Sequence, residues 1–201
     1  MIVTLVDYGA GNLASVERAL DRLGAASKRA NTPEAIDTAD VLLLPGVGHF
    51  AALMHGLDER KLREPLCEAL RRGVPYLGIC LGLQALYESS EEAPEVAGLT
   101  VFRGSVEALP ALVKLPHMGW NHVTKLRESA VLRGVPHDAR FYFAHSFAAD
   151  QQNGDVAATC CHGIPFAAAI ERENIWAVQF HPEKSAASGE RVLKNFLEFA
   201  R

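Results

Sequence analysis

Apolar and polar positions alternate in blocks along the first ninety residues, and the blocks predict strands and helices in turn. Apolar runs at 2–6, 41–44 and 76–79 indicate buried strands, and 25–30 indicates a weaker one. Four helical regions are expected in addition. The first runs from residue 13 to Gly24, and the second begins at Thr32-Pro33-Glu34. The third follows Gly48 and continues to Arg72, with an interruption or restart at Pro65, and the fourth covers Leu81–Tyr87. Strands without a polar face are typical of a parallel sheet covered by helices on both sides.

The second half of the chain has a different pattern, with many strands and few helices. Strands are expected at 101–106, 120–124, 141–147, 156–161, 166–171 and 175–180, and they should add an antiparallel portion to the sheet. A last helix has an apolar face made of Val192, Leu193, Phe196, Leu197 and Ala200. No repeat or linker interrupts the pattern. We therefore expect one α/β domain, residues 1–201, with a mixed, mostly parallel open sheet flanked by helices.

Composition narrows the possible partners and the compartment. A chain of 201 residues is long enough to bury a sizeable core. Its 24 acidic residues outnumber its 20 basic ones, which argues against a nucleic-acid-binding surface. The four cysteines include no CxxC pair, and the first apolar run stops at Asp7. Reduced thiols, no signal peptide, no membrane segment and a cytoplasmic location are the expectations.

The segment Gly78-Ile79-Cys80-Leu81-Gly82 has the form of a nucleophile elbow. It joins a predicted strand to a predicted helix, and glycines flank the cysteine as they flank serine in G-x-S-x-G. A thiol at a helix N-terminus is favoured as the thiolate. The alternative is a buried structural cysteine, the role expected for Cys67, Cys160 and Cys161.

A base and its orienting group lie together in His181-Pro182-Glu183. The motif follows the predicted strand 175–180, so His181 should project at the sheet edge where Cys80 lies. Glu183 could then accept a hydrogen bond from the imidazole. Alternatively, both side chains simply belong to a surface loop.

Together these motifs resemble those of the class I glutamine amidotransferases, whose Cys, His and Glu triad has this chain order. Further segments extend the resemblance over essentially the whole chain and narrow it to the glutaminase subunits of imidazole glycerol phosphate synthase, of histidine biosynthesis. They are Asp7-Tyr-Gly-Ala-Gly-Asn-Leu13, Pro45-Gly-Val-Gly48, Pro116-His-Met-Gly-Trp-Asn121, His145-Ser-Phe147 and His181-Pro-Glu-Lys-Ser185.

The resemblance implies a flavodoxin-like fold and a thioester mechanism acting on L-glutamine. Cys80 would attack the carboxamide, His181 would relay the protons, and Glu183 would hold the imidazole. The oxyanion hole would be formed at Val47, Gly48 and Leu81. Glycines there permit a peptide flip, which would let the hole form only in an activated state, although Pro45–Gly48 is also compatible with an ordinary turn.

The same resemblance implies a substrate-binding set made of Gly46, Gln84, Glu92, His145, Ser146 and Phe147. Glu92 falls where a carboxylate holds the substrate α-ammonium, and His145–Phe147 where the α-carboxylate is held. A solvated loop is the alternative for Glu92, and a core strand for the segment 141–147.

It further implies a partner. A cyclase subunit with a (β/α)₈ barrel would form a heterodimer, receive ammonia directly, and make imidazole glycerol phosphate and aminoimidazole carboxamide ribonucleotide. Asn12, Met118, Trp120 and Lys184 would meet it, unless Trp120 is a core residue and Lys184 a solvated one. No cofactor is implied.

Some histidines fit none of these roles. His117, His122 and Cys160-Cys161-His162 have no spacing typical of a structural zinc site, so no metal is expected. His49 has no assigned role. Three alternatives stay open: a glutaminase for pyridoxal phosphate or anthranilate synthesis, another cysteine hydrolase, and a non-catalytic binding module on the same fold.

Overall fold

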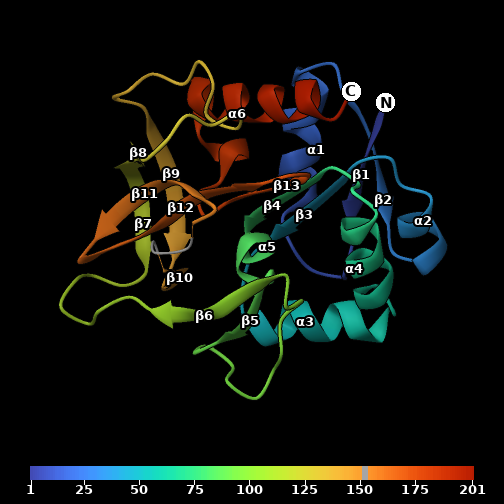
Figure 1. Ribbon diagram of the computed structural model, residues 1–201, viewed down its shortest axis with the longest axis horizontal. Coiled ribbons are helices and arrows are strands. Elements are labelled where there is room, and N and C mark those ends of the chain that lie inside the picture. The colour runs from blue at the N-terminus through green and yellow to red at the C-terminus, as the bar shows by residue number, and fades with distance from the viewer. Residues whose placement is uncertain (151–153) are drawn as a thin grey trace.

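The computed structural model describes residues 1–150 and 154–201, and its centre is an eight-stranded sheet (Figure 1). The strands lie in the order β2-β1-β3-β4-β13-β12-β11-β8. The first five are parallel and the rest antiparallel, which confirms the expected mixed sheet. Their bounds are Ala26–Ala30, Ile2–Val6, Leu42–Gly46, Tyr76–Cys80, Ile175–Val178, Ile164–Arg172, Val156–His162 and Thr124–Lys125.

Helices cover both faces of this sheet. Figure 1 shows α1 (Leu13–Arg22) and α6 (Ala186–Phe199) on one side, with α3 (Phe50–Glu59) and α4 (Arg63–Arg71) on the other. Alternate side chains of each central strand enter opposite cores: Leu43 of β3 packs in one hydrophobic cluster, and Leu42 and Leu44 in the other. A short helix, α2, spans Pro33–Asp37 and is capped by Thr32.

Five strands lie outside the main sheet. Four of them belong to the second half of the chain, and the expectation that they extend the main sheet is wrong for these; the fifth, β5, was not predicted as a strand. Two small sheets form instead, one with the order β10-β6-β5 and one made of β7 and β9. The strands span Tyr87–Ser90 (β5), Phe102–Ala108 (β6), His117–His122 (β7), Arg140–His145 (β9) and Phe147–Ala149 (β10).

Two helical predictions need correction. The helix expected over Leu81–Tyr87 is a single turn, α5 (Leu81–Gln84), because the carbonyls of Ala85 and Leu86 accept hydrogen bonds from the segment 99–102. The break before α4 lies at Lys61, whose φ is +57°, and not at Pro65. Pro65 is tolerated in the first turn of α4, because the N–H groups of a first turn have no partner within the helix and proline loses no hydrogen bond there. Among the described residues, no helix is long and apolar enough to cross a membrane.

Candidate active site

Cys80 ends β4 in a strained backbone conformation, with φ at +56°, that turns the chain sharply into α5. The two flanking glycines are required by close packing: a Cβ on Gly78 would overlap the carbonyl oxygen of Gly82, and one on Gly82 would overlap that of Leu44. The Tyr76 hydroxyl, fully buried, donates to the Gly82 carbonyl at 2.8 Å and fixes the turn. Since α5 has one turn, its dipole favours a thiolate less than the predicted longer helix would.

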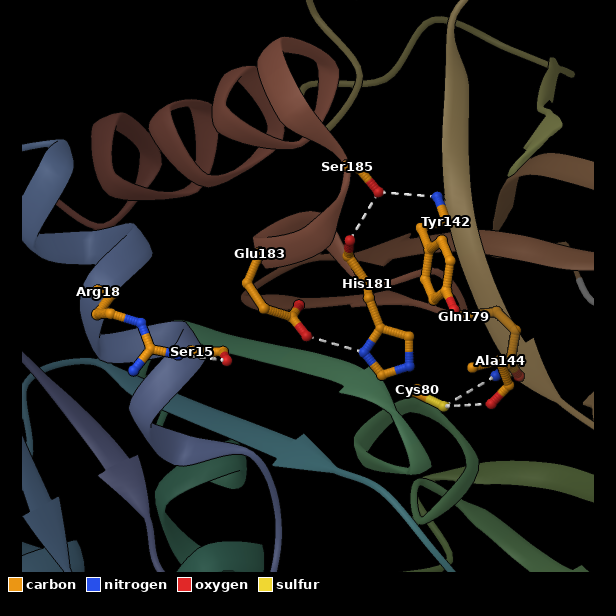
Figure 2. Close-up of polar contacts among 9 residues, drawn as sticks. All are labelled: Ser15, Arg18, Cys80, Tyr142, Ala144, Gln179, His181, Glu183 and Ser185. Carbon is orange, nitrogen blue, oxygen red and sulfur yellow. Dashed lines mark hydrogen bonds and ion pairs between the residues drawn. The ribbon is translucent and has the colours of Figure 1, made fainter. Parts of the chain in front are cut away.

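His181 faces this cysteine with its ring held by Glu183. The His181 Nδ1 lies 2.9 Å from Glu183 Oε1, and both side chains are 2% exposed. Figure 2 shows the other ring nitrogen, Nε2, turned toward Cys80. Burial alone lowers the pKa of His181, but hydrogen bonding and charge attraction from Cys80 and Glu183 outweigh it, so the pKa is raised. The arrangement suits an imidazole that accepts the thiol proton.

Ser185 fixes the backbone of His181, a contact that the sequence reasoning missed. Its hydroxyl donates to the His181 carbonyl at 2.6 Å and accepts from the Tyr142 amide at 2.9 Å, as Figure 2 shows. The His181 amide in turn donates to the Tyr142 carbonyl at 2.8 Å. The histidine is thus tied to β9. Ser185 belongs to the quoted HPEKS motif, which was the only signal for it in the sequence.

One cavity of about 280 Å³ brings most of the predicted site residues together. Gly46 and Glu183 are not among the described residues that line it. Glu183 lies behind His181, and Gly46 packs against Leu81, so that a side chain at Gly46 would collide with the elbow. The lining residues are Val47, Gly48, Cys80, Leu81, Gln84, Glu92, Ala144, His145, Ser146, Phe147, His181 and Lys184.

The substrate-binding candidates in this cavity are already partly engaged. Glu92 accepts the Phe50 amide at 2.7 Å through Oε2, which holds its carboxylate at the start of α3. Both ring nitrogens of His145 have protein partners, the Phe147 carbonyl at 2.9 Å and His117 at 3.0 Å. The Ser146 and Phe147 carbonyls also accept protein hydrogen bonds, from the Leu109 amide and from Gln84 and His145. The Ser146 hydroxyl is therefore the polar side-chain group of this segment that remains for a ligand.

Two of the expected partner-contact residues, Trp120 and Lys184, lie near the same aromatic ring, that of Tyr142. Trp120 on β7 is 51% exposed, which rules out the core alternative, and its ring contacts Tyr142 with 6.2 Å between centroids. Lys184 Nζ lies 5.7 Å from the centre of the same Tyr142 ring. Met118, also on β7, is 65% exposed. Asn12 lies apart from them, at the start of α1, where it lines a separate cavity.

The remaining histidines and cysteines do not line the cavity that holds Cys80. His49 caps α3 by accepting the Ala51 amide at 3.2 Å. His117 stacks on His162 with 4.2 Å between ring centroids. Cys160 is buried, as expected, but Cys161 is exposed, so packing is the wrong role for it. In the described part of the chain, no group of His, Cys, Asp and Glu is arranged to hold a metal ion.

Comparison with known proteins identifies the family that this fold and site define. The family model "Glutamine amidotransferase class-I" matches residues 4–199, so the chain belongs to that family. A crystal structure of a glutamine amidotransferase superposes with a TM-score of 0.79 at 20% identity, covering 100% of this chain and 99% of the other, and shows the shared fold.

Sequence relatives narrow the assignment. The chain is 48% identical over 200 residues to "Imidazole glycerol phosphate synthase subunit HisH" of Moorella thermoacetica, covering 99% of this chain and 95% of the relative. It is 44% identical to "Imidazole glycerol phosphate synthase hisHF, chloroplastic" of Arabidopsis thaliana, covering 98% of this chain and 34% of that protein. Within the amidotransferases, it belongs to the HisH family.

Proposed function

We propose that this chain is a glutaminase subunit that hydrolyses L-glutamine and passes ammonia to a cyclase, as part of an imidazole glycerol phosphate synthase. The observation that carries the proposal is the cavity in which Cys80 faces His181, whose Nδ1 is held 2.9 Å from Glu183. Family membership supports the amidotransferase chemistry, and the HisH relatives support the synthase.

The chemistry follows from these three side chains. His181 takes the Cys80 proton through Nε2, and the sulfur attacks the substrate carboxamide carbon to form a C–S bond and an oxyanion. Collapse of this intermediate breaks the C–N bond, and His181 gives the proton to the departing ammonia. A γ-glutamyl thioester remains. Water, deprotonated by His181, then attacks the thioester; the C–S bond breaks, glutamate leaves, and His181 returns the proton to the Cys80 sulfur, while Glu183 keeps Nδ1 protonated throughout.

The oxyanion is stabilised by backbone amides beside the sulfur. The Leu81 amide follows the nucleophile, and Val47 and Gly48 line the same cavity from the end of β3. Gly48 has φ at +98°, a conformation that glycine adopts without strain, so the Val47–Gly48 peptide can reorient at little cost. Such a peptide flip would form the hole when the partner is bound.

The cavity also holds groups for the amino-acid end of glutamine. Glu92 uses Oε2 for the Phe50 amide, and its Oε1 is the oxygen we assign to the substrate ammonium. The backbone of 145–147 and the Ser146 hydroxyl would bind the α-carboxylate. Gln84 would act at the cavity wall, where its amide is held by Phe147 and Gln179.

The cyclase, a separate (β/α)₈ barrel, would dock on the face that carries Trp120, Met118 and Lys184, with Asn12 at a second contact. Large aromatic side chains exposed on one face are typical anchors of interfaces. Lys184 both lines the catalytic cavity and lies over Tyr142, so it is placed to report partner binding to the site. The heterodimer would work in the cytoplasm, where the four free cysteines stay reduced.

Glutamate release tests the proposal. The isolated chain should turn over glutamine slowly or not at all, and addition of the cyclase with its nucleotide ligand should activate it. Cys80→Ala should abolish the activated rate while the variant still binds the cyclase in a pull-down. Full activity without the cyclase would refute the coupling, and turnover that survives in Cys80→Ala would refute the mechanism.

A further inference from the structure

The Cys80 sulfur has a second polar neighbour besides His181. The Gln179 Nε2 lies 3.5 Å from it, and the Gln179 side chain is completely buried just after β13 (Figure 2). The Ala144 carbonyl oxygen lies farther away, at 4.0 Å. An amide N–H donates to a thiolate, whereas a carbonyl oxygen repels one. Gln179 is therefore the neighbour that favours the thiolate.

The orientation of the Gln179 amide is dictated by Gln84. Gln84 Nε2 donates to the Phe147 carbonyl at 2.8 Å and to Gln179 Oε1 at 3.1 Å. A backbone carbonyl only accepts hydrogen bonds, so the nitrogen of Gln84 must face it. The same nitrogen then requires the oxygen of Gln179 opposite it, which leaves the nitrogen of Gln179 as the atom at the sulfur.

The Phe147 carbonyl is also the end of a second series of hydrogen bonds, which begins on β7. Asn121 Nδ2 donates to the Cys161 carbonyl at 3.0 Å and to His117 Nε2 at 3.1 Å. His117 Nδ1 then donates to His145 Nε2 at 3.0 Å, and His145 Nδ1 to the Phe147 carbonyl at 2.9 Å. The Cys161 and Phe147 carbonyls at the two ends can only accept hydrogen bonds. They therefore determine which nitrogen donates and which accepts in each bond of the series.

Both histidines of this series stay neutral, as these single-proton bonds require. Burial lowers the pKa of His145 to about 3 and that of His117 to about 4. The Phe147 carbonyl thus accepts from two neutral donors, Gln84 Nε2 and His145 Nδ1. A turned Gln84 amide would place its oxygen against this carbonyl and lose the hydrogen bond.

We propose that Gln179 is a positioning residue that donates through Nε2 to the Cys80 sulfur, stabilises the thiolate and aims it into the cavity. Gln84, Phe147 and the His145–His117–Asn121 series hold Gln179 in the donating orientation. This role compensates for the short α5, whose single turn supplies only a weak dipole at the nucleophile. It rests on the proposed function only in taking Cys80 as the nucleophile.

The pH dependence of Cys80 alkylation tests this role without glutamine or a partner. Iodoacetamide reacts with the thiolate, and mass spectrometry of the Cys80 peptide separates it from Cys67 and Cys161. In Gln179→Met, which keeps the side-chain length but lacks the donor, the pH midpoint of alkylation should rise by about one unit. The alkylation rate near neutral pH should then drop roughly tenfold.

Asn195→Leu is the matched control. Asn195 is also a buried amide with two hydrogen bonds to backbone carbonyls, but it lies on α6 and contacts Val131 and Arg133. The Asn195→Leu substitution should lower the thermal unfolding midpoint without changing the pH dependence of Cys80 alkylation. Gln179→Glu keeps the oxygen that accepts from Gln84 but removes the donor to the sulfur. The pH midpoint of Cys80 alkylation should therefore rise at least as much as in Gln179→Met.

An unchanged alkylation profile in folded Gln179→Met, or in folded Gln179→Glu, would overturn the proposal. So would a midpoint that rises equally in Asn195→Leu, because the shift would then reflect general loosening of the fold. Circular dichroism establishes that each variant is folded. A failure of the proposed glutaminase function would appear separately, as glutamate release that survives in Cys80→Ala.

Discussion

At the scale of single residues, the site depends on how firmly the His181 imidazole is held. Glu183 holds Nδ1 at 2.9 Å, and Ser185 and Tyr142 hold the backbone on the other side. Glu183 itself does not line the described cavity, so its carboxylate acts on the substrate only through His181. Its effect should therefore fall on the chemical step and not on glutamine binding.

Glu183→Gln separates those two effects. The amide keeps the shape of the carboxylate but loses its charge, so it no longer favours the protonated imidazole or the tautomer with hydrogen on Nδ1. In the presence of the cyclase, kcat should drop roughly 10²–10⁴-fold, with KM nearly unchanged. Steady-state glutamate release measures both constants.

Glu198→Gln serves as the control for that substitution. Glu198 lies near the end of α6 and forms a surface ion pair with Arg133, with 3.0 Å between the charged groups. Loss of this pair should leave kcat and KM unchanged. A kcat for Glu183→Gln within a factor of two of the wild-type value would show that the carboxylate does not act through His181.

Individual residues also show how far short sequence motifs reach: the structure brings the three predicted triad residues together. Cys80, His181 and Glu183 were predicted from short local motifs, because a nucleophile elbow and a base–orienter pair each need residues close together in the chain. Gln179 and Ser185 were missed. Gln179 contacts Cys80 and Ser185 contacts Tyr142, and in each pair the two residues are remote in sequence. The HPEKS motif included Ser185 but did not indicate its contacts.

At the scale of elements, apolar patterning predicted the central strands well and the pairing of the later ones poorly. Strands β1, β3 and β4 are almost completely buried, and their sequences are accordingly almost free of polar residues, with Thr4 of β1 the exception. By contrast, only His117 of β7 is buried, and its partner β9 was predicted to join the main sheet. Pairing depends on contacts between distant segments, and the pattern within one strand does not encode them.

The β7–β9 pair carries the neutral His117 and His145, and this makes its stability depend on pH. In the folded chain, burial keeps the pKa of these groups near 4 and near 3, whereas the unfolded chain protonates histidine near pH 6.5. The unfolded state thus binds more protons as the pH falls below about 6.5, and stability decreases. His181 acts oppositely, since its raised pKa stabilises the fold below about pH 6.5 and loses that effect at higher pH.

His117→Gln should flatten this acid-side dependence. Each buried imidazole contributes up to about 1.4 kcal/mol per pH unit below about 6.5, and removing one should reduce the decrease in Tm by about 2–4 °C per pH unit. Thermal unfolding at about pH 7 and about pH 5.5 gives the slope. His137 is exposed, so His137→Gln should keep the wild-type slope. Equal slopes in wild type and His117→Gln would show that His117 does not stay neutral in the fold.

At the scale of the whole molecule, the cavity that holds Cys80 lies next to the aromatic face, the exposed surface that carries Trp120 and Met118. The cavity lies at the carboxyl ends of β3 and β4, the position at which open α/β sheets bind ligands. Tyr142 joins the two regions: its backbone holds His181, and its ring contacts Trp120 and Lys184. A partner that binds the aromatic face would thus touch the same strand that positions the base.

If Cys80 carries the γ-glutamyl group during turnover, mass spectrometry of acid-quenched enzyme should detect that group on it. The chain is mixed with glutamine and the activating cyclase, quenched during turnover and digested. We expect one γ-glutamyl group on the peptide that contains Cys80, and none in Cys80→Ala. A γ-glutamyl group on another residue, or steady glutamate release without any modification of Cys80, would contradict it.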